Sequence, residues 1–271
     1  MPAVEASSNP AALVGDSPLL VVWPERFLFL GRLGHVAKHR HAADVCLVAI
    51  SGRLGIRVES SPDWWYGTSA LIPAGCMHEV QFGNEVTAVL YNDAHRPYYR
   101  ALSARDRHQP ILGIPPEAEL QRALRRFRVE ETSAGSAARV ALERCFAAAL
   151  GTYADSPPID ARIRKLVKML ESKVDQNFTL EELAEKVNLS PSRLQHLFLG
   201  ETGVPLRRWR TWMRIRYVLR ELARGASVTR AALTCGFASS AHFSHAFKSM
   251  FGVSARSALV GKARTRMIFV S

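Results

Sequence analysis

Two stretches of the chain, LAEKVNLSPSRLQHLFLGETG at residues 183–203 and AALTCGFASSAHFSHAFKSMFG at residues 231–252, repeat one pattern of apolar residues. At an offset of 48, the matching positions are Leu183-Ala184, Val187 and Leu189 against Ala231-Ala232, Cys235 and Phe237. After a one-residue insertion, Leu194, Phe198 and Gly203 match Phe243, Phe247 and Gly252 at an offset of 49. Apolar residues at helical spacing on both sides of a short polar break predict a helix, a tight turn and a second helix in each copy.

A short helix, a tight turn and a second helix form the helix-turn-helix motif, whose second helix enters the major groove of DNA. The distribution of charge agrees with this interpretation. Residues 1–155 hold 16 basic and 16 acidic residues, whereas residues 156–271 hold 20 basic and 8 acidic ones and carry the whole net charge of +12. A basic half-chain attracts polyanions, and nucleic acid is the foremost of these. Two copies of the motif in the only basic part of the chain therefore favour a DNA-binding protein.

The segments around the repeat also carry helix signals. Thr179 followed by Glu182 is a capping box, and Ser190 with Pro191 marks the start of the next helix. A long helix is expected from Pro205 to about Ala223, and it would join the two helix-turn-helix units. Ser227 is expected to cap the helix after it, and Ser239 or Ser240 the last helix of the repeat.

Residues of about 160–260 resemble the DNA-binding domain of the AraC/XylS family of bacterial regulators. The resemblance rests on LAEKVNLSPSRLQHLFLGETGVPLRRW and on AALTCGFASSAHFSHAFKSMFG, the second of which is close to the family pattern GFxSxxxFxxxFKxxFG. Ala255 departs from the pattern, because the family usually has proline there. The resemblance implies an effector-responsive transcriptional activator, with double-stranded DNA and RNA polymerase as partners, acting in the cytoplasm.

Helical geometry separates the inward faces of the two recognition helices from their outward faces. Leu194 and Phe198 of the first helix, and Phe243 and Phe247 of the second, face inward. The connecting helix adds arginines that can neutralise phosphates. The candidate DNA-contacting residues are Ser192, Gln195, His196, Arg207, Arg210, Arg214, Ser240, Ala241, Ser244, His245 and Lys248. The resemblance places the serine, glutamine, histidine and alanine side chains of this set toward the bases.

The N-terminal half has the pattern of an all-β domain. Between Leu19 and about Tyr91, short apolar runs such as VCLVAI and EVTAVLY alternate with turn signals, which predicts a sandwich or barrel. Residues 1–18 are expected to be a flexible arm, 19–95 the barrel, 96–154 a helical segment and 155–158 a linker. The DNA-binding domain then covers residues 159–262, and a basic tail residues 263–271. The expected fold is thus α+β and multidomain.

Apolar stripes within residues 117–153 predict two helices. Leu120, Leu124 and Phe127 form the first stripe, and Leu142 and Phe146 belong to the second. Such a stripe packs either on its own domain or across a homodimer seam, and the spacing leaves both open. The four cysteines are scattered, which suits free thiols in a reducing compartment. No apolar run approaches the roughly 20 residues that a membrane-spanning helix needs.

Three histidines are the chemically suggestive group of the N-terminal half. The segment from Gly67 to His78 reads G-x5-P-x-G-x2-H, and together with His39 and His41 it resembles the two halves of the cupin motif. Cupin-like barrels are also the usual sensor domain of AraC-type regulators. The resemblance implies an effector pocket walled by these histidines, and Cys76 shares a strand face with His78.

The position at which metal-binding cupins have a glutamate is Val45 here. Asp44 cannot easily replace it, because neighbouring strand residues point to opposite faces. We therefore expect an organic effector and no required cofactor. A divalent transition metal held by His39, His41 and His78 is the alternative, which would make the protein a metal sensor. A metal-dependent cupin enzyme with a basic appendage is a further alternative that Val45 argues against, so no catalytic residue is assigned. An architectural DNA-binding protein without a ligand would not need the pocket motif.

Overall fold

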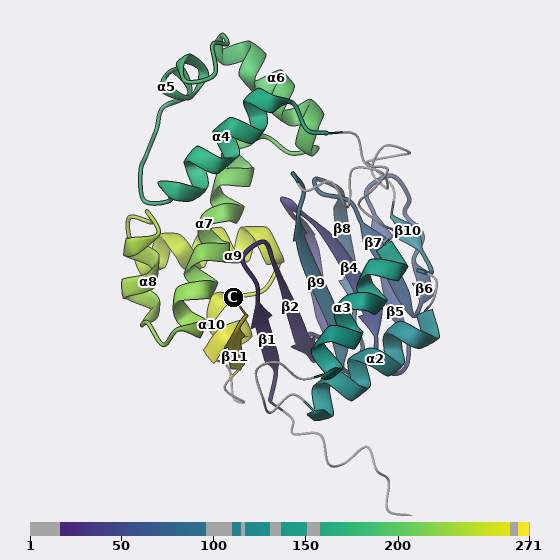
Figure 1. The fold of residues 1–271 in the computed structure, drawn as a ribbon. Helices are drawn as coiled ribbons and strands as arrows, with labels where there is room; N and C mark the ends of the chain where they lie inside the picture. The colour runs from purple at the N-terminus through teal and green to yellow at the C-terminus, as the bar shows by residue number, and fades with distance from the viewer. Residues whose placement is uncertain are drawn as a thin grey trace, which may run out of the picture.

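The computed structural model describes residues 17–95, 110–114, 117–130, 137–150, 158–260 and 265–270. Two β-sheets lie beside a helical body, and two further helices pack against the larger sheet (Figure 1). This confirms the expected α+β multidomain fold. The expected arm at residues 1–16, the first part of the expected helical segment at 96–109 and most of the expected linker at 155–157 lie outside the described residues.

The N-terminal half consists of two packed sheets. The larger sheet has the strand order β10 (Ile111–Leu112), β7 (Ser69–Ile72), β4 (Ala43–Ala49), β9 (Thr87–Asp93), β2 (Arg26–Gly31), β1 (Leu19–Val22) and β11 (Arg266–Phe269). The smaller sheet has the order β3 (His35–Arg40), β8 (Met77–Gln81), β5 (Leu54–Val58) and β6 (Trp65–Gly67). Val45 and Leu47 of β4 lie in the core between the sheets, and Cys46 and Val48 lie in a second core on the other face. Burial on both faces explains the unbroken apolar run in this strand.

The second core is covered by α2 (Glu117–Glu130) and α3 (Ala137–Leu150). Its helical members are Leu120, Leu124, Phe127, Leu142 and Phe146, so both predicted stripes pack on their own domain. Arg125 also donates hydrogen bonds to the Ile50 carbonyl just beyond β4. The expectation that residues 96–154 are helical is wrong at Ile111–Leu112, because these residues form β10 and pair with β7.

The C-terminal half contains seven helices among its described residues. They are α4 (Ala161–Ser172), α5 (Leu180–Glu185), α6 (Pro191–Thr202), α7 (Leu206–Ala223), α8 (Val228–Thr234), α9 (Ser240–Phe251) and α10 (Ala255–Val260). The expected caps are confirmed at Thr179, Ser190, Ser227 and, of the two candidate serines, Ser239. Within the described part of the chain, no helix is long and apolar enough to cross a bilayer.

The two helix-turn-helix units are α5–α6 and α8–α9, and equivalent residues make their turns. Asn188 and Gly236, 48 positions apart, both have a positive φ, of 53° and 79°. Asparagine tolerates this region of backbone space, whereas position 236 has a further constraint. A Cβ atom there would lie 2.9 Å from the Asp175 carbonyl oxygen. Only glycine therefore fits the second turn.

The end of α9 packs directly on the β-sheet domain. The Phe251 ring lies 5.2 Å from Tyr91, 5.7 Å from His41 and 5.9 Å from Phe27, measured between ring centroids. Gly252 follows, and a Cβ atom there would lie 2.6 Å from Val36 Cγ1. The two halves of the chain consequently share one continuous apolar core.

A buried polar network joins the same two halves. Asp93 at the end of β9 is fully buried, and its Oδ1 accepts hydrogen bonds from Trp209 Nε1 at 2.8 Å and His95 Nδ1 at 2.7 Å. Its Oδ2 lies 2.8 Å from Nη1 of Arg216, whose Nη2 donates to Glu171 at 2.7 Å. Burial opposes ionisation of Asp93, but His95 and Arg216 outweigh it, so the pKa of Asp93 is lowered.

The segment expected to be a basic tail is instead a strand of the N-terminal domain, which corrects that prediction. Strand β11 pairs in parallel with β1 over four residues, and hydrogen bonds to the Pro18 and Val22 carbonyls extend the pairing at 2.8 and 2.9 Å. Ile268 packs on the core under α2 and α3, and Phe269 on the core between the sheets. The chain therefore returns to the β-sheet domain after the second helix-turn-helix unit.

We expect Asp93→Ala to lower the free energy of unfolding by about 3–5 kcal/mol, because it leaves the buried Arg216 charge without the more deeply buried of its two carboxylate partners. Replacing the pair together, by Asp93→Leu with Arg216→Met, is expected to cost less than Asp93→Ala alone. Urea unfolding followed by circular dichroism measures both. Lys38→Ala removes an exposed ion pair with Glu59 and should leave the transition unchanged. A transition of the Asp93→Ala variant that coincides with the wild type would contradict the role given to this network.

Candidate nucleic-acid interface and buried histidine cavity

The first recognition helix, α6, presents a polar face to solvent. Ser190 caps it and Pro191 occupies its first turn, so its start is fixed locally. Leu194 and Phe198 are fully buried, whereas the predicted contact residues Ser192, Gln195 and His196 are exposed. The division into core and outward faces is therefore confirmed for this helix, and its outward side chains can donate to and accept from base edges.

The second recognition helix, α9, has the same division. Phe243 and Phe247 are buried. Of the predicted residues, Ala241, Ser244, His245 and Lys248 are exposed, and Ser240 is half-buried. The Ser244 hydroxyl donates to the Ser240 carbonyl at 2.8 Å, which leaves it free to act only as an acceptor toward DNA.

The three predicted arginines of the connecting helix α7 have different environments. Arg207 is exposed. Arg210 instead donates to the Phe178 carbonyl at 2.8 Å, and Arg214 donates to Val174, Gln176 and Asn177. These acceptors belong to the loop between α4 and α5, and all of them except the Asn177 side-chain oxygen are backbone carbonyls, which need donors there. Arg210 and Arg214 thus hold this loop, and their assignment as phosphate contacts stays a prediction.

A groove separates the two recognition helices, and its lining includes residues that the sequence analysis missed. Leu199 comes from the end of α6, Arg208 from α7 and His242 from α9, and Arg40 is contributed by β3 of the other domain. Leu199 and His242 lie on the expected helices and could have been included on periodicity alone. No pattern in the sequence points to Arg40 as part of this groove, because it lies more than a hundred residues before either recognition helix.

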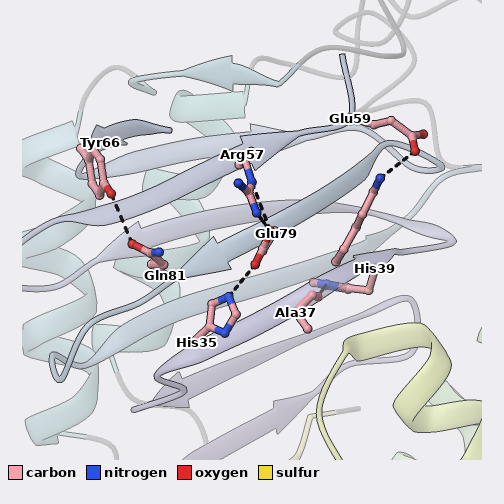
Figure 2. Close-up of polar contacts among 9 residues, drawn as sticks. His35, Ala37, His39, Arg57, Glu59, Tyr66, Glu79 and Gln81 are labelled. Carbon is pink, nitrogen blue, oxygen red and sulfur yellow. Dashed lines mark hydrogen bonds and ion pairs between the residues drawn. The ribbon is translucent and has the colours of Figure 1, made fainter. Parts of the chain in front are cut away.

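The three predicted histidines meet inside the β-sheet domain. His39 on β3 is the register partner of His78 on β8, and His41 follows β3. The His39 and His41 Nε2 atoms lie 2.9 Å apart, and the three ring centroids lie 4.4 to 5.0 Å from one another. Nδ1 of His39 donates to the Ala37 carbonyl (Figure 2) and Nδ1 of His78 to that of Cys76, which turns both Nε2 atoms toward the cluster.

Burial keeps these imidazoles neutral. Burial lowers the pKa of His39. Burial first, and then electrostatic repulsion from the His39 ring, lower the pKa of His78 to about 3. The pKa of His41 is lowered well below its ordinary value, first by burial and then by the other two histidines. Neutral imidazole is the form that coordinates metals and that both donates and accepts hydrogen bonds.

A cavity of about 50 Å³ adjoins the histidines. The two domains line it together: Phe27 and Tyr91 come from the sheets, and Phe247, Phe251 and Val253 from the second helix-turn-helix unit. Such a volume admits a few water molecules or an ion, whereas pockets for drug-sized ligands measure roughly 300–1,000 Å³. Cys76, expected as a fourth wall residue, is buried but is not among the described residues that line the cavity.

The histidine cluster has the donor set of a transition-metal site. The candidate ligand atoms of His39, His41 and His78 all lie within 4.8 Å of one another, and two of the three rings are oriented by backbone carbonyls. Three imidazoles with an open position suit zinc or a similar ion. Val45 is fully buried among apolar side chains, and the Asp44 carboxylate faces away to accept from the Ala74 backbone N–H. No described carboxylate joins the cluster.

Comparison with known proteins bears on the C-terminal half. A helix-turn-helix domain family model matches residues 183–259. The arabinose operon regulatory protein of Escherichia coli K12 is 35% identical over 104 residues, which cover 36% of this chain and 34% of that protein. The transcriptional activator RhaS of Escherichia fergusonii is 34% identical over 106 residues, covering 38% and 37%. The chain thus matches only about a third of the length of these relatives.

Solved structures share the arrangement of both halves. Apo ToxT K231A of Vibrio cholerae has a TM-score of 0.60 at 14% identity, and the match covers 86% of this chain and 96% of ToxT. Wild-type ToxT with a bound unsaturated fatty acid has a TM-score of 0.57, also at 14% identity, over 92% and 98%. At this identity the similarity shows a common fold. The family model shows that residues 183–259 form a helix-turn-helix domain, and the sequence matches show that this part of the chain is similar to part of the arabinose and RhaS regulators.

Proposed function

We propose that this protein is a sequence-specific, DNA-binding transcriptional regulator, and that its N-terminal domain responds to an effector. The observation that carries the proposal is the pair of exposed polar faces on α6 and α9, which one connecting helix holds in a basic domain. Recognition helices joined in this way can enter successive major grooves, about 34 Å apart. Each monomer would then read two short segments of non-palindromic sequence.

The effector is proposed to act at the cavity between the two domains. The similarity to ToxT suggests a fatty acid, but a cavity of about 50 Å³ lined by Phe251 is too small to hold such a chain. An organic effector of ordinary size therefore requires the contact between α9 and the sheets to open. Because it would bind only the opened arrangement, it would shift the balance between the two arrangements.

A transition metal is the second candidate effector, and the three neutral imidazoles favour it. A metal ion fits a cavity of about 50 Å³ without any movement of Phe251, and His39, His41 and His78 would hold it. Bound there, it would supply fixed positive charge and no chemistry of its own. Val45 and the absence of a carboxylate among the described residues of the cluster argue against a cupin enzyme.

A cytoplasmic homodimer that contacts RNA polymerase completes the proposal. The apolar stripes of α2 and α3 are buried within the chain, so a dimer surface must use other residues. Val129 on α2 is 64% exposed and Val140 on α3 is 52% exposed, which makes the outer side of this helix pair the surface we propose. Activation rather than repression follows from the named activators among the relatives.

The DNA-binding proposal predicts how histidine substitutions change affinity. A duplex selected by the protein from random sequence serves as the specific site, and a scrambled duplex as the non-specific one. We expect His196→Ala or His245→Ala to weaken specific binding by about 1–3 kcal/mol if the ring contacts a base, with little change on scrambled DNA. Fluorescence anisotropy measures both affinities.

The matched control for these variants is His35→Ala, which removes an exposed histidine paired with Glu79 on the smaller sheet (Figure 2). This variant should bind both duplexes as the wild type does. Equal losses on the two duplexes would make His196 and His245 phosphate contacts. Failure of the wild-type chain to bind any duplex at low salt would overturn the proposed function.

The metal alternative predicts that about one equivalent of zinc, nickel, copper or iron copurifies with the wild-type protein. The triple substitution of His39, His41 and His78 by Ala should remove it, because it takes away all three imidazole ligands of the cluster. Elemental analysis of both proteins, followed by calorimetric titration with Zn²⁺, tests this. A metal-free wild type that does not take up Zn²⁺ would leave the organic effector as the only candidate.

The buried histidines also predict a pH dependence of stability. Their pKa values are lowered in the folded protein, so the unfolded chain takes up protons first as pH falls below about 6.5. The contribution of these neutral histidines to the free energy of unfolding should therefore be fully present near pH 7 and fall steadily toward pH 4. Changing all three histidines to Gln should flatten this slope. Urea unfolding at pH 7 and pH 5 measures it, and equal slopes in the two proteins would contradict the prediction.

A further inference from the structure

The groove between the recognition helices is positively charged, and one of its cations belongs to the N-terminal domain. Arg207 and Arg208 enter it from the start of α7, His245 enters it from α9, and Arg40 enters it from the end of β3. Arg40 and Arg207 are exposed. Among the described residues that line the groove there is no aspartate or glutamate. Burial lowers the pKa of Arg208 most, and the neighbouring Arg40 charge lowers it further, as expected for cations that share one site.

Backbone contacts hold Arg40 at this position. The Arg208 side chain donates a hydrogen bond to the Arg40 carbonyl. In the neighbouring turn of the sheets, a Cβ atom on Gly75 would lie 2.8 Å from the Gly203 carbonyl oxygen, so the turn touches the end of α6. Gly252 at the end of α9 is similarly close to Val36 of β3. Both recognition helices therefore end against the strand and turn that place Arg40.

The position of the groove matches a fixed feature of DNA. When two recognition helices enter successive major grooves, the phosphate backbones that border the intervening minor groove pass between the helices. Contacts to these phosphates position a protein on the duplex and are independent of sequence. Arginine suits them, because its planar guanidinium can donate two hydrogen bonds to one phosphate.

We propose that the sensor domain itself contacts DNA, and that Arg40 binds a backbone phosphate in the groove between α6 and α9 beside Arg207. This inference rests on the proposed function, since it concerns the same DNA complex. The Arg40 contact would also give the arrangement in which the two domains are docked a higher affinity for DNA than an opened arrangement, in which Arg40 would leave the groove. An effector that opens the cavity would then weaken DNA binding, and DNA would weaken effector binding by the same factor.

The test compares two arginine substitutions in the full chain. Arg53 is also exposed and lies beyond the other end of β4, a strand of seven residues that places it roughly 20 Å away from Arg40. That distance exceeds the Debye length of about 10 Å at 0.1 M salt, so Arg53→Ala removes the same charge outside the contact. Affinity for a mixed-sequence duplex is measured by fluorescence anisotropy between 50 and 200 mM salt.

Each phosphate contact contributes about 0.9 to the slope of log affinity against log salt concentration. The slope of Arg40→Ala should be smaller than that of the wild type by about 0.9. Over the fourfold salt range, the affinity of this variant should therefore fall about 3.5-fold less than the affinity of the wild type. Arg53→Ala should keep the wild-type slope, and Arg40→Lys should largely restore it. Coinciding thermal unfolding curves would establish that the Arg40 variants are folded.

Equal slopes for Arg40→Ala, Arg53→Ala and the wild type would overturn this inference while leaving the proposed function intact. A loss of slope in both alanine variants would also overturn it, because it would attribute the effect to net charge. The absence of duplex binding by the wild-type chain would instead remove the proposed function on which the inference rests. A slope that is lower only in Arg40→Ala supports direct contact of the sensor domain with DNA.

Discussion

The buried carboxylate of Asp93 organises the contact between the two halves of this protein. It lies at the end of a central strand, accepts a hydrogen bond from Trp209 and pairs with Arg216, and both partners lie on the connecting helix α7. Breaking a buried charged pair is strongly destabilising, because it leaves one charge without a partner away from water. The connecting helix is thereby fixed in position and rotation against the sheets. Because α7 joins both helix-turn-helix units, their orientation toward the sensor domain follows from this one contact.

Two apolar contacts extend the constraint along the helical domain. Phe251 at the end of α9 lines the cavity beside the histidines, and β11 returns the chain to the edge of the larger sheet. The second recognition helix therefore contacts the histidine cluster directly, through the Phe251 ring. A ligand that enlarges the cavity must displace the same residues that end α9. In this arrangement, the histidine cavity and the second helix-turn-helix unit share residues, so coupling between them would need no long pathway.

The structural features that were predicted correctly from the sequence depend on interactions between residues that lie close together in the chain. Thr179 with Glu182 forms its capping box, and Ser190 caps α6, because these bonds span only three residues. The inward and outward faces of α6 and α9 follow from helical periodicity. The same reasoning correctly placed Val45 inside the sheets and turned Asp44 away from the histidines, since strand residues alternate. The match of His39 with His78 followed a motif whose spacing reflects strand pairing.

The sequence by itself determined the helix-turn-helix duplication, the β-rich N-terminal half and the residues that face each core, because periodicity and caps are local properties. Only the tertiary structure decided which partners the long polar side chains bind within the protein. Arg210 and Arg214 carry the same charge as Arg207 on the same helix, yet their guanidinium groups donate hydrogen bonds to carbonyls of the α4–α5 loop. Arg40 reaches the groove through the docking of two domains, and β11 is a strand because β1 offers it an open edge. A hydrogen-bond donor binds whichever acceptor the fold brings near, and that partner is set by packing between segments far apart in the chain.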